Sequence, residues 1–290
     1  YKRGKQMITS ELQNKVTQNV IAQMETHGTN WLKSWVGDSR LPVNCESKKP
    51  YSGINLFILL GAEMTSHEWG TYAAWSRLGK QIRKGQKGTT IVFFKMLESK
   101  NGEVNFHTNE PVKIPMMKCY TVFNESQTQD YEVAPVVGGT EFSHVLADTW
   151  VKNTGANVEH LHARAFYNPN SDHINMPPMK TFFATDDANA EQNYYGTLFH
   201  ELTHWTGHAS RCDRNLKGKS DRKAYAFEEL VAELGACFQS VHFGIEPVET
   251  NPDHAKYLNS WMEALKDDNK FIFQASAKAN KAITFLNDLQ

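Results

Sequence analysis

The sequence predicts an α+β protein of two domains, 1–135 and 136–290. In both parts, windows with apolar residues at helical intervals of three and four alternate with short β-rich runs. Residues 132–140 contain a proline, two glycines and no periodic pattern, which is typical of a linker. The first part has 17 Lys and Arg against 12 Asp and Glu, and the second has 14 against 20. These counts give net charges of +5 and −6, so we expect the two domains to have different partners.

The first domain begins with a predicted helix over residues 10–23, where apolar side chains recur on one face. An apolar helix follows over 54–62. Two β-rich runs, 89–95 and 113–123, predict strands. The dipeptide Asn101-Gly102 between them is typical of a hairpin turn, so we expect a second pair of strands across it, with 113–123 as another strand.

The pattern of the second domain predicts helices with a few short strands between them. An amphipathic helix is expected over 141–152, and a charged loop over 209–223 separates two further helices. The remaining predicted elements are strands at 165–167 and 172–177 and helices at about 195–205, 224–239, 252–266 and 270–288.

Composition excludes several classes of protein. With 40% hydrophobic residues among 290, the chain can bury a sizeable core. Its longest apolar run, 54–62, is far too short to span a membrane, and the basic first residues are not followed by the apolar segment of a secretory signal. The four cysteines show no Cys-x-x-Cys spacing. We therefore expect a cytoplasmic protein with reduced thiols and no membrane partner.

A His-Glu-x-x-His motif at 200–204 predicts a metal site. Imidazoles at positions i and i+4 lie on one face of a helix, so His200 and His204 can bind the same ion, and Glu201 lies close enough to activate water. The alternative is a pair of surface histidines on an amphipathic helix. Ser210 occupies the position where metzincins carry a third histidine, which excludes that class.

A carboxylate further along the chain is the better candidate for the third ligand. Glu229 and Glu233 stand four residues apart on one face of the predicted helix 224–239, opposite its apolar stripe. We assign Glu229 as the ligand and Glu233 as the group that orients a ligating imidazole, although their roles could be exchanged. Glu228 points about 100° away and is expected to be a solvated charge. The alternative for all three is an acidic helix face.

Aromatic and basic residues alternate in the first domain. Between Glu68 and Glu98 the chain has six Lys or Arg and no acidic residue, and Gly85 and Gly88 predict a turn that presents several of these cations together. Single-stranded nucleic acid binds such surfaces, because bases stack on rings and cations follow the phosphates. The alternative is that most of the rings are core. The candidate DNA-binding residues are Trp31, Trp35, Tyr51, Trp75, Lys80, Arg83, Lys84 and Lys87.

Several of these motifs together resemble the ArdC-type antirestriction proteins. The segments 51–55, 69–79 and 81–95 resemble the amino-terminal domain of that family, and 200–208 with 227–235 resemble its zincin-like carboxy-terminal domain. The resemblance implies a plasmid-encoded protein that protects incoming DNA from restriction. It also implies an amino-terminal domain that binds single-stranded DNA and a zincin-like metallopeptidase domain. The amino-terminal part resembles a portion of plasmid primases as well.

The combined reading is a metallopeptidase in which His200, His204 and Glu229 hold Zn²⁺, or Mn²⁺, Co²⁺ or Ni²⁺, and Glu201 is the catalytic base. By analogy with zincins, the strand at 172–176 should form the edge along which a peptide pairs. The oxyanion donor stays open between Tyr225 and a nearby histidine. The expected partners are single-stranded DNA and an unidentified protein substrate, for which DNA-associated host proteins are the candidates. The alternatives are a DNA-binding protein whose metal site is structural or regulatory, and a repressor-cleaving protease.

Overall fold

A computed structural model confirms the α+β class and describes most of the chain. The described residues are 9–28, 31–32, 41–62, 64–98, 104, 113–132, 143–184, 189–216, 221–245 and 254–290. The predicted hairpin turn at Asn101-Gly102 therefore lies outside the described residues.

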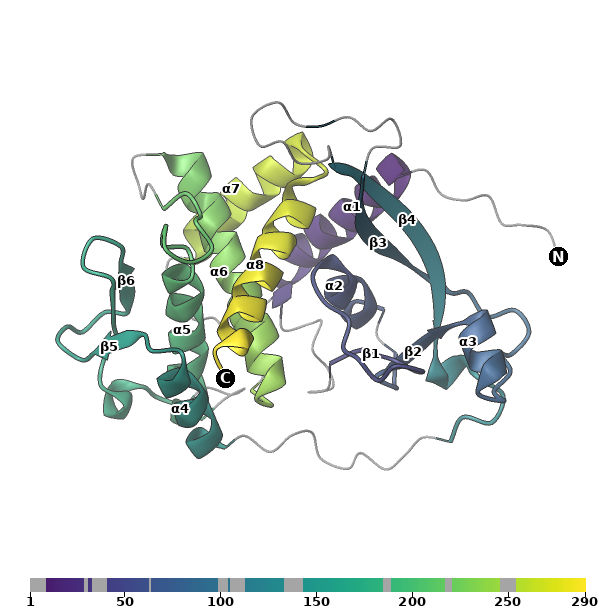
Figure 1. Ribbon diagram of the computed structural model, residues 1–290, viewed down its shortest axis with the longest axis horizontal. Coiled ribbons are helices and arrows are strands. Elements are labelled where there is room, and N and C mark those ends of the chain that lie inside the picture. The colour runs from purple at the N-terminus through teal and green to yellow at the C-terminus, as the bar shows by residue number, and fades with distance from the viewer. Residues whose placement is uncertain are drawn as a thin grey trace.

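The first part of the chain forms three helices and a sheet (Figure 1). The helices are α1 (Thr9–His27), α2 (Ile54–Leu60) and α3 (Tyr72–Arg77). The strands are β1 (Val43–Asn44), β2 (Glu68–Thr71), β3 (Thr89–Glu98) and β4 (Lys113–Asn124), and they stand in the order β1-β2-β4-β3. Strands β3 and β4 overlap the two predicted β-rich runs, and they pair antiparallel over the whole of β3.

The second part is mainly helical. Its helices are α4 (His144–Asn153), α5 (Ala190–Trp205), α6 (Arg222–His242), α7 (His254–Asp267) and α8 (Phe271–Asp288). Its short strands are β5 (Asn157–Glu159), β6 (Phe166–Asn168) and β7 (His173–Asn175). Each of these elements overlaps one that the sequence predicts, except β5, where no strand was expected.

The three-stranded sheet corrects one expectation. The strand predicted to be the edge, β7, lies in the middle of the order β5-β7-β6, because it pairs with both of its neighbours. The outer strand next to α5 is β6, and both β6 and β7 contact this helix, which carries the histidines. A peptide that adds to this edge would therefore pair with β6.

Both parts of the chain contribute to one hydrophobic core. The largest buried cluster joins Val20 of α1 and Phe57 of α2 to Leu234 of α6, Trp261 of α7 and Ala275 of α8. In Figure 1, α6 and α8 lie in the middle of the molecule, with α1 and α2 toward the β3–β4 hairpin and α5 on the opposite side. The 135/136 boundary thus divides the chain into two segments that pack against each other through apolar side chains.

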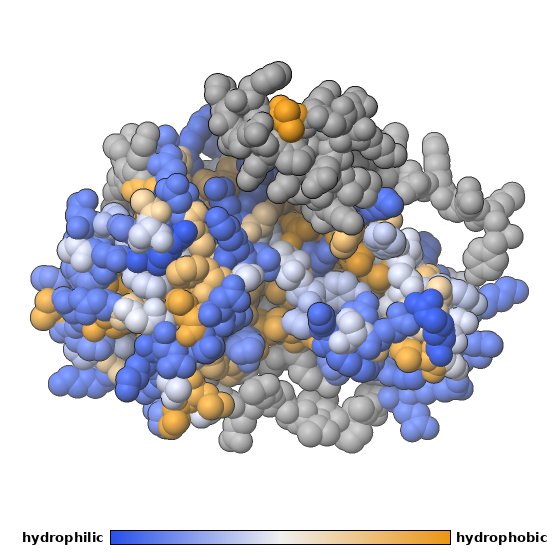
Figure 2. Space-filling view, in the orientation of Figure 1, coloured by the Kyte–Doolittle hydropathy of each residue, from blue (hydrophilic) through white to orange (hydrophobic). Residues whose placement is uncertain are grey.

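The face in Figure 2 is mostly hydrophilic, with hydrophobic residues in small separate areas. Among the described helices, none combines the length and the apolar character that a membrane span requires.

The free edge of β3 is covered by a side chain of α2. The Asn55 amide donates to the Val92 carbonyl at 2.6 Å and accepts from the Val92 N–H at 2.9 Å, so it replaces the hydrogen bonds of a missing strand. This contact fixes α2 against the hairpin.

Replacing Asn55 by alanine should lower the free energy of unfolding by about 1–3 kcal/mol, because both Val92 backbone groups lose their partner. Asn14→Ala is the matched control, since the exposed Asn14 side chain accepts a solvent-exposed hydrogen bond from the Asn269 side chain. Urea titration measures both variants, and equal midpoints would contradict the role given to Asn55.

Candidate functional site

Helix α5 carries the two histidines through the interior of the protein. It begins at a capping box, in which the Asn189 side chain accepts from the Gln192 N–H at 2.8 Å and Gln192 bonds back to the Asn189 N–H. From Tyr194 to Thr203 every residue is buried. This central part of the helix therefore has no solvated face, and His200 lies in the core beside helix α6.

Close packing brings α6 to the histidines. A Cβ atom at Gly235 would lie 2.5 Å from the Thr203 Oγ1, so only glycine permits this approach. The Thr203 hydroxyl is itself fixed, because it donates to the Phe199 carbonyl at 2.8 Å. Ala232 and Ala236 of α6 are small and buried as well, while Gly235 is a residue that periodicity did not single out.

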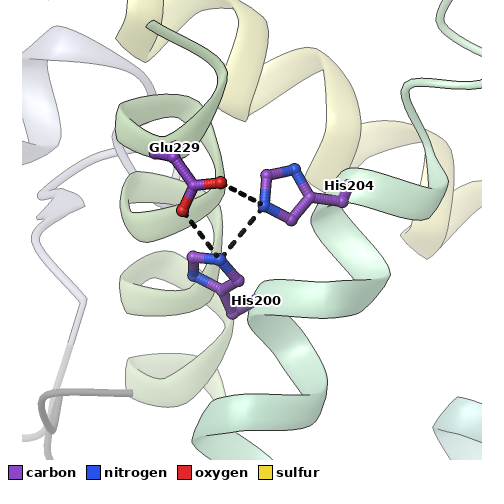
Figure 3. Close-up of side chains that lie close together, drawn as sticks. All are labelled: His200, His204 and Glu229. Carbon is purple, nitrogen blue, oxygen red and sulfur yellow. Dashed lines mark hydrogen bonds and ion pairs between the residues drawn. The ribbon is translucent and has the colours of Figure 1, made fainter. Parts of the chain in front are cut away.

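His200, His204 and Glu229 converge on one point (Figure 3). The two Nε2 atoms are 3.1 Å apart, and the Glu229 carboxylate oxygens lie 3.7 Å from the His200 Nε2 and 3.5 Å from the His204 Nε2. Two ligand atoms bound to one tetrahedral zinc would be separated by about 3.3 Å. The buried Glu229 Oε2 accepts no hydrogen bond from the described residues, which suits an atom that binds an ion.

Glu233 lies on the other side of the His200 ring. Its Oε1 is 2.5 Å from the His200 Nδ1, so the Nε2 atom is turned toward Glu229. Burial lowers the pKa of His200, but the negative charge of Glu233, helped by its hydrogen bond, outweighs burial and raises the pKa to about 10. Without a metal, His200 is therefore protonated at neutral pH.

Glu228 is the residue whose expected role is wrong. It is buried, with 5% of its surface exposed, and its Oε1 lies 3.2 Å from the His204 Nδ1. Arg214 holds the same carboxylate through Nε at 2.9 Å and Nη2 at 2.8 Å. Burial opposes ionisation of Glu228, but the bonds from His204 and Arg214 outweigh it and lower the pKa. The carboxylate therefore orients His204 as Glu233 orients His200.

Arg214 comes from the charged loop between α5 and α6, and sequence reasoning missed it. Its guanidinium is buried and also donates to the Thr203 carbonyl and the Thr206 hydroxyl, at 2.5 and 2.8 Å, so it closes the end of α5. No periodic pattern could have found it, because a loop gives its side chains no regular direction. The one available signal was an arginine near a helix rich in glutamate.

Glu201 is buried and faces β6. Burial raises its pKa, while the nearby imidazoles oppose that rise and the backbone N–H of Tyr167 donates a hydrogen bond to the carboxylate. Strand β6 is held in place through the Tyr167 hydroxyl, which donates to Asp172 at 2.8 Å. Arg211 in turn bonds Asp172 and donates to the Trp205 carbonyl at 2.6 Å.

These groups line a pocket of about 240 Å³. Tyr225 reaches it from the first turn of α6, where its hydroxyl is hydrogen-bonded to Glu229 and Tyr257, and burial raises its pKa. The lining residues are Ala165, Phe166, Tyr167, Pro169, His200, Glu201, His204, Asn215, Leu216, Tyr225, Glu228 and Glu229. His173 and His208 are not among them and instead bond the neighbouring hydroxyls of Ser171 and Ser210.

Two of the aromatic residues predicted to contact DNA, Trp31 and Trp75, lie in the interior. Trp31 and Trp75 are each 1% exposed, and the Trp75 indole donates to the Phe123 carbonyl at 2.8 Å. Tyr51 is half-buried and packs against a small core cluster, and Trp35 lies outside the described residues. Trp31 and Trp75 have no free ring face for a base, since both are core residues.

The predicted cations divide into two groups. Lys80 forms an ion pair with Glu125, and Arg83 donates to the carbonyls of Ser126 and Thr128, so both stabilise the fold. Lys84 and Lys87 are exposed and form no ion pair within the described part of the chain.

Comparison with known protein families assigns each of the two parts of the chain to a family. Residues 146–278 match the model of a zincin-like metallopeptidase. Residues 10–123 match the amino-terminal domain of the anti-restriction factor ArdC. The protein is therefore a zincin-like metallopeptidase domain preceded by an ArdC amino-terminal domain.

The chain belongs to the ArdC family of antirestriction proteins. It is similar to the crystal structure of the antirestriction ArdC protein from plasmid R388, with a TM-score of 0.76 and 39% identity over 96% of this chain and 97% of that one. An Mn(II)-bound structure of that ArdC protein matches with the same TM-score and coverage at 38% identity.

Two curated relatives extend the comparison. The protein y4eC of Sinorhizobium fredii is 32% identical over 97% of this chain and 93% of its own length. The DNA primase TraC of Escherichia coli is 33% identical over 94% of this chain, but the chain spans only 26% of the primase.

Removing the Arg214 guanidinium should strongly destabilise the protein. Arg214→Met leaves the buried Glu228 charge with only His204 beside it, and breaking such a buried pair costs about 3–5 kcal/mol. Chemical denaturation checks this value. Arg77→Met, which breaks the exposed pair with Glu46, serves as the control and should leave the midpoint nearly unchanged. Similar losses in both variants would contradict the importance given to Arg214.

Proposed function

We propose that this protein protects incoming plasmid DNA from restriction by binding single-stranded DNA, and that it carries a metal-dependent peptidase site. One observation carries the peptidase part: two imidazoles and a carboxylate converge beside a buried glutamate in a pocket next to a free strand edge. The family supports the antirestriction part, and the similarity to a DNA primase supports the handling of DNA.

His200, His204 and Glu229 would hold the metal. Two nitrogens and one oxygen suit Zn²⁺, and the Mn(II)-bound ArdC structure supports Mn²⁺ as an alternative, with Co²⁺ and Ni²⁺ also compatible with this donor set. Such a metal would polarise a peptide carbonyl and lower the pKa of bound water. Glu233 and Glu228 orient the two imidazoles toward the ion.

Glu201 is the proposed general base. Because burial raises its pKa, the carboxylate is suited to take a proton from water and return it to the leaving amine near neutral pH. Tyr225 is placed to donate a hydrogen bond in the same pocket and is our candidate for stabilising the oxyanion. A peptide that pairs with β6 would pass directly over these groups.

The proposed partners are single-stranded DNA and a protein near that DNA. We propose that the protein acts in the cytoplasm, which agrees with four free cysteines. The second candidate function is DNA protection in which the metal site is structural. It is favoured by the core that α1 and α2 share with α6, because a metal bound at α6 would also stabilise that core.

Metal binding should release the proton held by His200. Since the pKa of His200 is raised to about 10, this proton is present between pH 6.5 and 10 and must leave before Nε2 can bind an ion. Metal affinity should therefore rise with pH across that interval. Calorimetric titration of metal-free protein with zinc or manganese, in two buffers of different ionisation enthalpy, counts the protons released.

Glu233→Gln should release about one proton fewer at pH 7.5, because Glu233 is the main cause of the raised pKa of His200. Glu191→Gln, at an exposed glutamate on α5, the helix that carries His200, should behave like the wild type. An unchanged proton count in Glu233→Gln would show that His200 is neutral before the metal binds.

Glu201→Gln separates the two candidate functions. The amide keeps the metal ligands but removes the base, so peptide hydrolysis should fall by about 10²–10⁴ while bound metal, measured by elemental analysis, stays equal. In a conjugation assay, protection of a plasmid with restriction sites should fall with it. Full protection by this variant would establish the second candidate and exclude proteolysis as the protective step.

A further inference from the structure

Two aromatic side chains are exposed together on the β3–β4 hairpin. Phe93 is 49% exposed and Tyr120 is 44% exposed, and their ring centroids are 6.3 Å apart in an edge-to-face arrangement. The register pairs Ile91 with Tyr120 and Phe93 with Lys118, so these four residues share one face of the hairpin. An edge-to-face pair leaves at least one ring with an uncovered face.

The face that carries the two rings is packed at one end and open at the other. Ile91 and Val122 share this face and are buried in a small cluster with Leu59 of α2. Phe93 and Tyr120 lie further along the paired strands, outside that cluster, and keep nearly half of their surface exposed. The face is therefore covered by α2 at Ile91 and accessible at the two rings.

Three lysines without ion pairs to described residues lie on β4 and in the turn before β3. Lys118 is exposed on the face of the two rings, and Lys84 and Lys87 stand in the turn that leads directly into β3. None of the three forms an ion pair with a described residue, whereas Arg77 and Lys80 nearby are both paired. From Lys87 to Phe93 the chain advances about 20 Å, the length of a few nucleotides.

We propose that Phe93 and Tyr120, with Lys118, Lys84 and Lys87, form the surface that binds single-stranded DNA. We name these five residues the hairpin surface. The inference rests on the proposed function and specifies where its DNA partner binds. Unpaired bases stack on the exposed rings, while the lysines contact the phosphates. The bases of a duplex are already stacked inside it and cannot reach such rings, and three lysines without acidic partners favour a polyanion over an apolar protein.

Phe93→Ala/Tyr120→Ala tests the rings in the full-length protein. Each stacked base adds enough affinity that this double variant should bind fluorescent oligo(dT) about tenfold or more weakly, as measured by anisotropy. The matched control is Val145→Ala/Leu146→Ala, which removes two exposed apolar residues from α4 and should bind like the wild type. A second double variant, Phe93→Trp/Tyr120→Trp, should bind oligo(dT) about as tightly as the wild type, because indole rings also stack on bases.

The outcomes separate the surface from the function. If the wild type binds oligo(dT) and the alanine double variant binds equally well, the hairpin surface is wrong while single-strand binding stands. If the wild type does not bind oligo(dT), both proposals fail. A loss that the tryptophan variant does not reverse would also overturn the proposal, since it would show that stacking is not the contact.

The lysines have a test of their own in the salt dependence. Lys84→Gln, Lys87→Gln and Lys118→Gln should each reduce the slope of log affinity against log salt concentration by about 0.7, the value for one phosphate contact on a single strand. Lys48→Gln is the control, because Lys48 is paired with Glu68. Unchanged slopes in all three variants would remove these lysines from the surface.

Discussion

The close approach of α5 and α6 is the constraint on which the rest of the structure depends. Gly235 lies against the Thr203 side chain with no room for a methyl group. A larger residue would push the helices apart and withdraw the Glu229 carboxylate, which now lies 3.5 Å from the His204 Nε2. The metal ligands are separated by only one turn on α5, so the third ligand must come from a neighbouring element. Backbone contact between two buried helices provides it.

That same contact creates an electrostatic problem in the interior. Glu201, Glu228, Glu229 and Glu233 are all buried, and among the described residues Arg214 is the one buried guanidinium or ammonium group. Buried charges are stable only when they are paired or bind metals. Arg214 neutralises Glu228, and a protonated His200 offsets Glu233. The negative charge of Glu201 and Glu229 remains and favours the binding of a divalent cation. The charge of the site and its imidazole ligands therefore both favour a metal ion.

The sequence predicted the elements well and the tertiary environment of individual residues less well. Helical spacing placed His200 and His204 on one face and Glu229 on another helix, because periodicity is a local property. The burial of Glu228 could not be inferred, since it depends on Arg214, a loop residue whose direction no local pattern determines. Likewise, the sequence gives no sign that the Trp31 ring is buried and the Phe93 ring exposed, because this difference depends on how α1 and α2 pack.

The packing also fixes the proposed DNA surface relative to the metal site. Asn55 binds the Val92 backbone of the hairpin, and two residues along α2 the Phe57 ring packs against Phe238 of α6 with centroids 5.1 Å apart. Helix α6 then carries Glu229 into the site. Strand, helix and metal ligand are thus joined through buried contacts between the two segments of the chain. If the hairpin surface holds a single strand as proposed, the pocket would lie at one distance from the bound DNA, and the proposed substrates would be proteins close to that strand.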